Sequence, residues 1–410
     1  MNNPNRCRIL PCRACLRIRH VDDDGCCTEC VDTEQRLLTD GGHGLGELST
    51  LEPREALDMW LNRQRTERSD ATIQSYFYRT QTFIDWLESE GFDDLNELTG
   101  RDLYRFDSYR RSKGLAPSTL KTQLGTIRLF LAFCEDIEAV PRGFSAKMAV
   151  PTLTKKDRTN DEKLTSERAQ VIRDGLKRYR RASRDHVLFV LAWETGCRLG
   201  ALRSLDLQDC YLTTEDLDDL RHRDDVDEDI LERIDVPFLY FRHRPDTDTQ
   251  LKNKEEGERP VNLSEETGEL VQEYITVNRV PAKDDFGRKP LFSTHKGQGR
   301  MTTGAIRARF NIMTQPCRYG SCPHDRDKAT CEALQHGKES RCPSSRSPHR
   351  IRTGSITHHR DSEWPPEVLS EKVNATPEVI RDHYDHPDLL KRMQSRRSYL
   401  ANFDEEEGDE

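Results

Sequence analysis

The sequence predicts a mainly α-helical protein with a small β-sheet, in which an all-helical module precedes an α+β module. Three observations support this prediction. Residues 51–150 repeat apolar side chains at helical spacing, between helix-start and helix-stop signals. Two short runs, 236–242 and 258–263, are typical of strands that flank a turn. Clustered cysteines at the amino terminus indicate a zinc-ribbon-like module ahead of both.

The expected ribbon occupies residues 1–35 and rests on two Cys-x-x-Cys pairs that are eleven residues apart. Each pair can supply two thiolates, and tetrahedral zinc takes four such ligands. The four cysteines of these pairs are Cys12, Cys15, Cys27 and Cys30. Cys7 and Cys26 are spare, and Cys26 could exchange with Cys27. The alternative is a tail of reduced cysteines without metal. Residues 36–50 are rich in glycine and are expected to form a linker.

The helical module, residues 51–150, is expected to contain four helices. Ser69 is placed to open the second helix, and Gly91 to close it. Thr99 precedes the third helix, and Pro117 opens the fourth.

A polar linker, residues 151–165, is expected to lead into the α+β module at 166–400. Helical segments are predicted at 167–179 and 185–195. Residues 213–235 are unusually acidic and predict an exposed helix and loop. The two predicted strands follow, and the turn between them contains two lysines.

Acidic residues outnumber basic ones in the chain, 73 to 64, which gives a net charge of −9. The excess has two explanations: a solvated surface, or a surface that stays hydrated in a very salty cytoplasm, as in a haloarchaeon. The acidic tail, residues 401–410, is expected to be disordered. No run of 18 apolar residues occurs, and arginines interrupt the amino terminus. We therefore expect a soluble, cytoplasmic protein.

Five side chains occur in an order that suits phosphodiester chemistry in which no metal takes part. They are Arg198, Lys252, His349, Arg352 and Tyr384. Two guanidinium groups can clamp phosphate oxygens with paired donors. A lysine and a histidine can move protons, and a tyrosine can attack and hold the phosphate covalently.

The motifs around these residues resemble those of the tyrosine recombinase (phage integrase) family. Arg198 ends the sequence Thr-Gly-Cys-Arg, where the family has Thr-Gly-x-Arg between two helices. His349-Arg-Ile-Arg352 matches the family's His-x-x-Arg and is followed by the small-residue stretch Thr-Gly-Ser-Ile-Thr-His. Tyr384 follows Arg352 by 32 residues, as in compact family members. The resemblance covers roughly residues 50–400. It implies that the helical module is a core-binding domain and that the α+β module is the catalytic domain.

The resemblance also implies a role for each residue. Arg198 and Arg352 would neutralise the charge of the scissile phosphate. Lys252 would protonate the departing 5′ oxygen, and His349 would help to take the tyrosine proton. Tyr384 would form a 3′-phosphotyrosyl intermediate, so that rejoining needs neither ATP nor a metal.

Lys254 is the alternative to Lys252, because residues two apart share one face of an extended segment. Three positions depart from the family pattern: Ala201, Thr353 and Ala375. Ala375 stands where the family has His or Trp, nine residues before the tyrosine, and Asn374 is a possible replacement.

The helical module is expected to contact DNA phosphates through polar side chains near its last two helices. The candidates are Lys113, Ser118, Thr119, Lys121 and Arg128. Ordinary surface polarity is the alternative for any one of them.

A second group of cysteines precedes His349 and predicts a structural zinc site that would brace a long loop, residues 317–342. Its members are Cys317, Cys322, Cys331 and Cys342. His324 could compete with one of the cysteines.

The leading hypothesis is a site-specific recombinase or integrase of a mobile element, which acts as a homodimer or homotetramer on double-stranded DNA. Residues 389–400 could dock on a neighbouring protomer. The alternatives are a non-catalytic DNA-binding protein with the same fold and a type IB topoisomerase.

Overall fold

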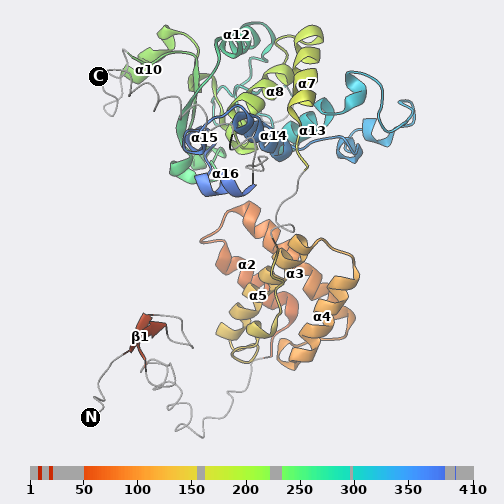
Figure 1. Cartoon of the computed structure of the whole chain (residues 1–410). Helices are drawn as coiled ribbons and strands as arrows, with labels where there is room; N and C mark the ends of the chain where they lie inside the picture. The colour runs from red at the N-terminus through yellow and green to blue at the C-terminus, as the bar shows by residue number, and fades with distance from the viewer. Residues whose placement is uncertain are drawn as a thin grey trace. The chain divides into compact units, whose positions relative to one another are not determined.

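The computed structural model describes residues 8–11, 18–21, 50–154, 162–221, 233–295, 299–383 and 393. The chain divides into two compact units, 1–160 and 161–410 (Figure 1). The fold is mainly α-helical with a small β-sheet, which confirms the predicted fold class. Within the described residues, no helix is long and apolar enough to cross a membrane.

At the amino terminus, β1 (Arg8–Pro11) and β2 (Ile18–Val21) pair antiparallel, with Arg8 opposite Val21. The four cysteines predicted for the ribbon, Cys12, Cys15, Cys27 and Cys30, lie outside the described residues. The ribbon therefore stays a prediction.

The helices of the first unit begin and end close to the expected signals. They are α2 (Pro53–Gln64), α3 (Asp70–Ser89), α4 (Gly100–Ser112) and α5 (Pro117–Asp136), with short 3-10 turns at Leu95–Glu97 and Ser145–Lys147. Thr99 and Asp102 form a capping box at the start of α4, and the Thr99 N–H donates to Asp102 Oδ2 at 3.0 Å. Gly91 follows α3 with φ 83°, a conformation that favours glycine. Aromatic rings fill the core between the helices, and Trp60 and Phe83 are at most 1% exposed.

The second unit is built around α8, whose side chains are buried on nearly every side. The helices of this unit are α7 (Ser166–Tyr179), α8 (Arg184–Thr195), α9 (Leu199–Ser204), α10 (Asp218–Arg221), α12 (Glu265–Glu273), α13 (Thr303–Met313), α14 (Pro348–Asp361), α15 (Pro366–Val373) and α16 (Pro377–His383). Helices α7 and α14 pack against α8 (Figure 1). The segments predicted at 167–179 and 185–195 are thus confirmed as helices.

The sheet of the second unit has the antiparallel order β3–β4–β5, with bounds Cys210–Tyr211, Phe238–Phe241 and Arg259–Asn262. Leu239 pairs with Cys210 on one side and with Val261 on the other. The two predicted strands are β4 and β5, and the two-residue strand β3 was not predicted. A 3-10 turn, Lys254–Gly257, lies between β4 and β5.

Two connecting segments were assigned from the sequence, the acidic stretch 213–235 and the linker 151–165. The acidic stretch 213–235 begins with a 3-10 turn and α10, and residues 222–232 lie outside the described part. The predicted linker 151–165 is too long, because Leu164 is 0% exposed in the core of the second unit. Its N–H donates to Arg350 O at 3.1 Å. Gly354 in α14 permits this approach, since a Cβ there would lie 2.1 Å from Leu164 O.

Candidate active site

Arg198 lies at the junction between α8 and α9, as its motif predicts. Gly196 ends α8 with φ 57°, and Arg198 is the residue that caps the start of α9. The left-handed backbone favours glycine at position 196. A Cβ there would also lie 3.0 Å from Val373 Cγ1. The glycine therefore lets the end of α8 approach the end of α15.

His349 and Arg352 occupy one turn near the start of α14, which begins at Pro348. Arg352 is 4% exposed. Its Nη1 donates to Gly196 O and to Val373 O, both at 2.7 Å. Arg352 thus joins the end of α8 to the end of α15.

Three arginines meet at the carboxyl end of α15, where each donates to a different one of three successive carbonyl groups. Arg259 Nε donates to Lys372 O at 2.8 Å. Arg352 donates to Val373 O, and Arg198 Nη1 donates to Asn374 O at 2.7 Å. The last carbonyls of a helix lack partners within the helix and carry its negative dipole end. This helix end therefore gathers positive charge from three distant parts of the chain.

The pKa of Arg259 reflects its burial and the positive charges of the other two arginines. Partial burial lowers the pKa of Arg259 to about 10, and the charges of Arg352 and Arg198 contribute to this shift. The guanidinium also lies over the Phe241 ring, 4.8 Å from its centroid. Arg259 is still protonated at neutral pH, so the site holds clustered positive charge that an anion such as a phosphate would stabilise.

His349 and Lys252 belong to the same cluster. Desolvation lowers the pKa of His349 from its ordinary 6.5. The charges that lower it further are those of Arg352, Arg350, Lys252 and Arg198. A histidine with a lowered pKa is neutral at pH 7 and can accept a proton. The structure therefore brings four of the five predicted catalytic residues together.

The turn that contains Lys252 differs from the expected geometry. Lys254 was expected on the same face of an extended segment, but it has φ 52° and begins a 3-10 turn. That expectation was wrong because the backbone folds back directly after Asn253. The charge of Lys252 is one of those that lower the pKa of His349.

Asn374 occupies the left-handed position that ends α15, with φ 53°. Its Oδ1 accepts from Arg198 Nη1 at 2.9 Å and from Asn253 Nδ2 at 2.5 Å. Its Nδ2 donates to Glu256 O at 2.8 Å. Ala375 instead packs against a small apolar cluster that includes Val373.

The other two departures from the family pattern lie beside the site. Ala201 belongs to α9 and is 5% exposed, packed in the core of the second unit. Thr353 Oγ1 donates to His349 O at 2.9 Å, within α14.

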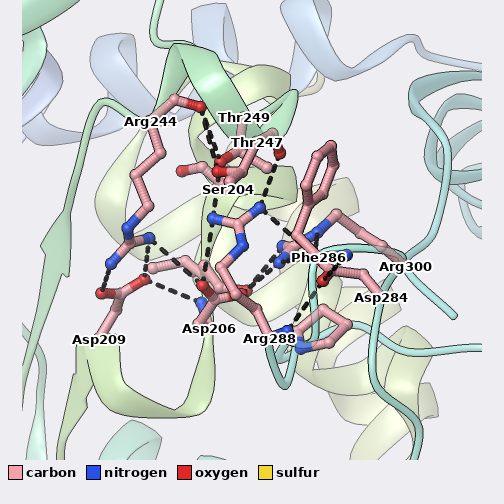
Figure 2. A network of polar contacts seen from close by, with 12 residues as sticks. Ser204, Asp206, Asp209, Arg244, Thr247, Thr249, Asp284, Phe286, Arg288 and Arg300 are labelled. Atoms are coloured by element: carbon pink, nitrogen blue, oxygen red, sulfur yellow. Dashed lines mark hydrogen bonds and ion pairs between the residues drawn. The ribbon is translucent and has the colours of Figure 1, made fainter.

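The second unit also contains a buried ion-pair network (Figure 2). Its charged members are Asp206, Asp209, Asp284, Arg244, Arg288 and Arg300. Asp206 is 1% exposed and pairs with Arg300, Arg244 and Arg288. Arg300 also contacts Asp284, from Nη2 at 2.8 Å. Each buried charge thus has at least one partner of opposite sign.

The network connects the two segments that supply Arg198 and Lys252. Asp206 follows α9, whose first residue comes directly after Arg198. Arg288 donates to Thr249 Oγ1 at 2.9 Å and to Thr247 O at 2.8 Å, shortly before Lys252 in the chain. The segment that leads into the loop with Lys252 (residues 251–257, the lysine loop) is therefore held against the end of α9.

Tyr384 lies outside the described residues, and α16 ends at His383, directly before it. The predicted position of the nucleophile therefore stays a prediction.

The predicted phosphate contacts of the first unit lie on its surface. Lys113 caps the end of α4, with Nζ 4.6 Å from the centroid of the Tyr109 ring. Ser118, Thr119 and Lys121 lie in the first turns of α5, and Arg128 lies farther along it. Lys121 is half-buried and the other four are exposed.

The cysteine-rich segment 316–347 contains 3-10 turns and no α-helix or strand. The apolar residues that it buries are Ala333 and Cys342. Desolvation raises the pKa of Cys317, and Cys322 and Cys342 raise it further, so these three thiols lie near one another. Across the residues that the structure describes, however, no group of three or more His, Cys, Asp or Glu side chains is arranged to hold a metal ion. His324 Nε2 instead lies 2.9 Å from Ser344 Oγ.

Comparison with known proteins places this geometry in a known fold. Residues 58–136 match the family model of the phage integrase N-terminal SAM-like domain. The lambda integrase dimer bound to a COC′ core site is 11% identical, with 88% of this chain and 87% of that chain covered and a TM-score of 0.55. Residues 58–136 therefore form a phage integrase N-terminal SAM-like domain, and the chain has the fold of these integrases.

Two further solved structures are similar to this chain. The Tn1549 transposon integrase in complex with circular intermediate DNA is 14% identical, covers 86% of this chain and 100% of its own, and has a TM-score of 0.53. The N-terminal domain of a phage integrase/site-specific recombinase from Haloarcula marismortui is 33% identical over 25% of this chain and 99% of that domain, with a TM-score of 0.25. Among curated proteins, none matches the sequence.

Sequence reasoning missed three groups in this recombinase fold: Arg259, Asn253 and the Asp206 network. Arg259 was included in a predicted strand, and its position just after the lysine turn was the available signal. Nothing in the sequence spacing indicates that Asn253 would meet Asn374 across 121 residues.

Proposed function

We propose that this protein is a site-specific DNA recombinase that cuts and rejoins DNA through a 3′-phosphotyrosyl intermediate. The observation that carries the proposal is the convergence of Arg198 and Arg352 at the end of α15. His349 lies one turn before Arg352 in α14, and Lys252 directly precedes Asn253, which contacts Asn374 at that same helix end. That helix immediately precedes α16, which ends one residue before Tyr384.

The proposed reaction is a transesterification. Tyr384 Oη forms a bond to phosphorus as the bond from phosphorus to the 5′ oxygen breaks. His349 takes the tyrosine proton, and Lys252 gives a proton to the departing 5′ oxygen. The guanidinium groups of Arg198 and Arg352 stabilise the charge that builds on the phosphoryl oxygens. The same steps in reverse rejoin a 5′ hydroxyl, so the phosphate bond is conserved.

Double-stranded DNA is the proposed substrate, and a homodimer or homotetramer is the proposed assembly. The similar solved structures include a lambda integrase dimer bound to a core site and a lambda integrase tetramer bound to a Holliday junction. The exposed polar residues at the start of α5 would contact the DNA backbone in the first unit.

The proposal predicts a covalent protein–DNA adduct. Nicked duplexes that carry the repeats flanking the gene should trap the protein on a 3′ end, and the complex should survive denaturing electrophoresis. Tyr384→Phe should bind the same duplex and give no adduct. Binding without an adduct in the wild type would favour a non-catalytic DNA-binding protein. Relaxation of any supercoiled plasmid without strand exchange would favour a type IB topoisomerase.

We further propose that the cysteine-rich segment binds one structural zinc ion through Cys317, Cys322, Cys331 and Cys342. These thiols are not arranged as a metal site in the structure, so zinc would gather them as it binds. Four thiols and a segment with little apolar core of its own support this proposal. Protein purified without chelator should contain zinc by elemental analysis. The double variant Cys317→Ser/Cys322→Ser should contain one zinc ion fewer, whereas Cys134→Ala, in the core of the first unit, should keep the wild-type content. Equal zinc content in all three proteins would contradict the assignment.

A further inference from the structure

Asn374 connects the end of α15 to two parts of the site at once. Its Oδ1 accepts from Arg198 and from Asn253, and its Nδ2 donates to Glu256 O. Asn253 directly follows Lys252 in the chain, and Glu256 lies in the 3-10 turn after it. One amide group therefore spans Arg198 and both sides of the loop that supplies the proposed acid.

The lysine loop, residues 251–257, also contacts two neighbouring side chains. The Leu251 N–H donates to His243 Nδ1 at 2.9 Å, and His243 Nε2 lies 3.7 Å from Glu255 Oε1. Gly257 O accepts from Arg259 Nη1 at 2.9 Å, so none of these contacts reaches Arg198.

Residues 252–256 are all exposed, and the buried residues that flank them are Leu251 and Gly257. A lysine side chain on an exposed loop has many rotamers, and fixing it in one costs conformational entropy. Contacts that hold the backbone on both sides of Lys252 reduce the range of positions that its ammonium group samples.

The contacts of Asn374 indicate that it acts through other residues rather than on the phosphate. Its Oδ1 has two lone pairs, and both have donors in the structure. The backbone also suits this role, because asparagine tolerates the left-handed conformation at φ 53° better than most residues.

We propose that Asn374 is a positioning residue that holds the lysine loop against Arg198, so that Lys252 reaches the departing 5′ oxygen. The proposal rests on the proposed function, because it assigns a partner to the acid of that same site. Asn374 couples the group that stabilises the phosphate to the group that protonates the leaving oxygen.

The test uses Asn374→Gly, which removes the side chain and keeps the left-handed backbone accessible. Glu363→Gly is the matched control, because Glu363 also has positive φ, at 65°, and is exposed after α14. Each variant is assayed in the full-length protein on two duplexes. One has the ordinary 5′ oxygen at the scissile phosphate, and the other has a bridging 5′ sulfur. A thiolate is a better leaving group than an alkoxide and needs no proton from an acid.

On the oxygen duplex, Asn374→Gly should cleave at least about 10-fold more slowly than the wild type, since loss of general acid catalysis costs about 10²–10⁴-fold. On the sulfur duplex, its rate should return to within about 3-fold of the wild type, as should that of Lys252→Ala. Arg198→Ala should stay slow on both duplexes. An Asn374→Gly rate equal to the wild type on oxygen, or equally slow on both duplexes, would overturn the proposal.

Hydrogen exchange of the free protein separates this inference from the proposed function. Amide protons of residues 251–257 should exchange faster in Asn374→Gly than in the wild type and in Glu363→Gly. Unchanged exchange would show that Asn374 does not hold the loop, whether or not the protein cuts DNA. Faster exchange in a protein that forms no adduct on any duplex would instead count against the recombinase function alone.

Discussion

Replacing Arg198 by alanine should lower the rate of DNA cleavage by about 10²–10³-fold, the cost of losing one donor that stabilises transition-state charge. Arg198 is half-buried at the start of α9, and its Nη1 donates to Asn374 at the end of α15. The remaining guanidinium groups still attract the DNA phosphate, so binding should weaken much less than cleavage. Single-turnover cleavage and equilibrium binding on the same nicked duplex measure the two effects.

Arg203→Ala is the matched control for this change. Arg203 lies on the same short helix, and its Nη2 pairs with Asp248 Oδ2 at 2.6 Å. Its removal should change the cleavage rate by less than about 3-fold, because the chemistry does not require it. A comparable loss of cleavage in both variants would mean that Arg198 acts through the stability of α9 and not on the phosphate.

Replacing Asp206 by asparagine should lower the free energy of unfolding by about 3–5 kcal/mol, the usual cost of breaking a buried ion pair from one side. Asp206 is 1% exposed and faces three guanidinium groups. Asparagine keeps the shape and removes the charge that compensates them, and Arg300 is itself 6% exposed. Denaturant unfolding of the full-length protein measures the loss.

Asp248→Asn provides the comparison for an exposed pair. Asp248 lies in the segment before Lys252, and its carboxylate also contacts an arginine, Arg203 of α9, but the Asp248 side chain is 62% exposed. Solvent screens such pairs, so the change should cost less than about 1 kcal/mol. Losses of similar size in the two variants would show that the network of Figure 2 does not stabilise the fold as its burial suggests.

Local signals in the sequence predicted much of the fold. The Thr99 capping box, Pro117 and the positive-φ glycine Gly91 lie where helices begin or end, because each acts through its own backbone or its neighbours within four residues. The two-residue strand β3 gave no such signal, since it is too short for alternation to be visible.

The candidate site was predictable where a motif marks it and not where distant segments meet. Arg198, His349 and Arg352 were found from their motifs. Arg259 joins the charged cluster because β5 packs against the end of α15, and no local sequence pattern predicts that packing. The prediction for Lys254 was wrong because it applied the two-residue repeat of an extended strand to a segment that turns.

The measurement that tests the account most directly is the chemical identity of the residue that joins the protein to DNA. Digestion of the trapped adduct with trypsin and nuclease should leave the nucleotide on the peptide of residues 382–391, between Arg381 and Lys391. In that peptide Tyr384 is the sole residue with a hydroxyl side chain, so its mass identifies the phosphotyrosyl bond. A nucleotide on any other peptide, or an adduct that persists in Tyr384→Phe, would contradict the account.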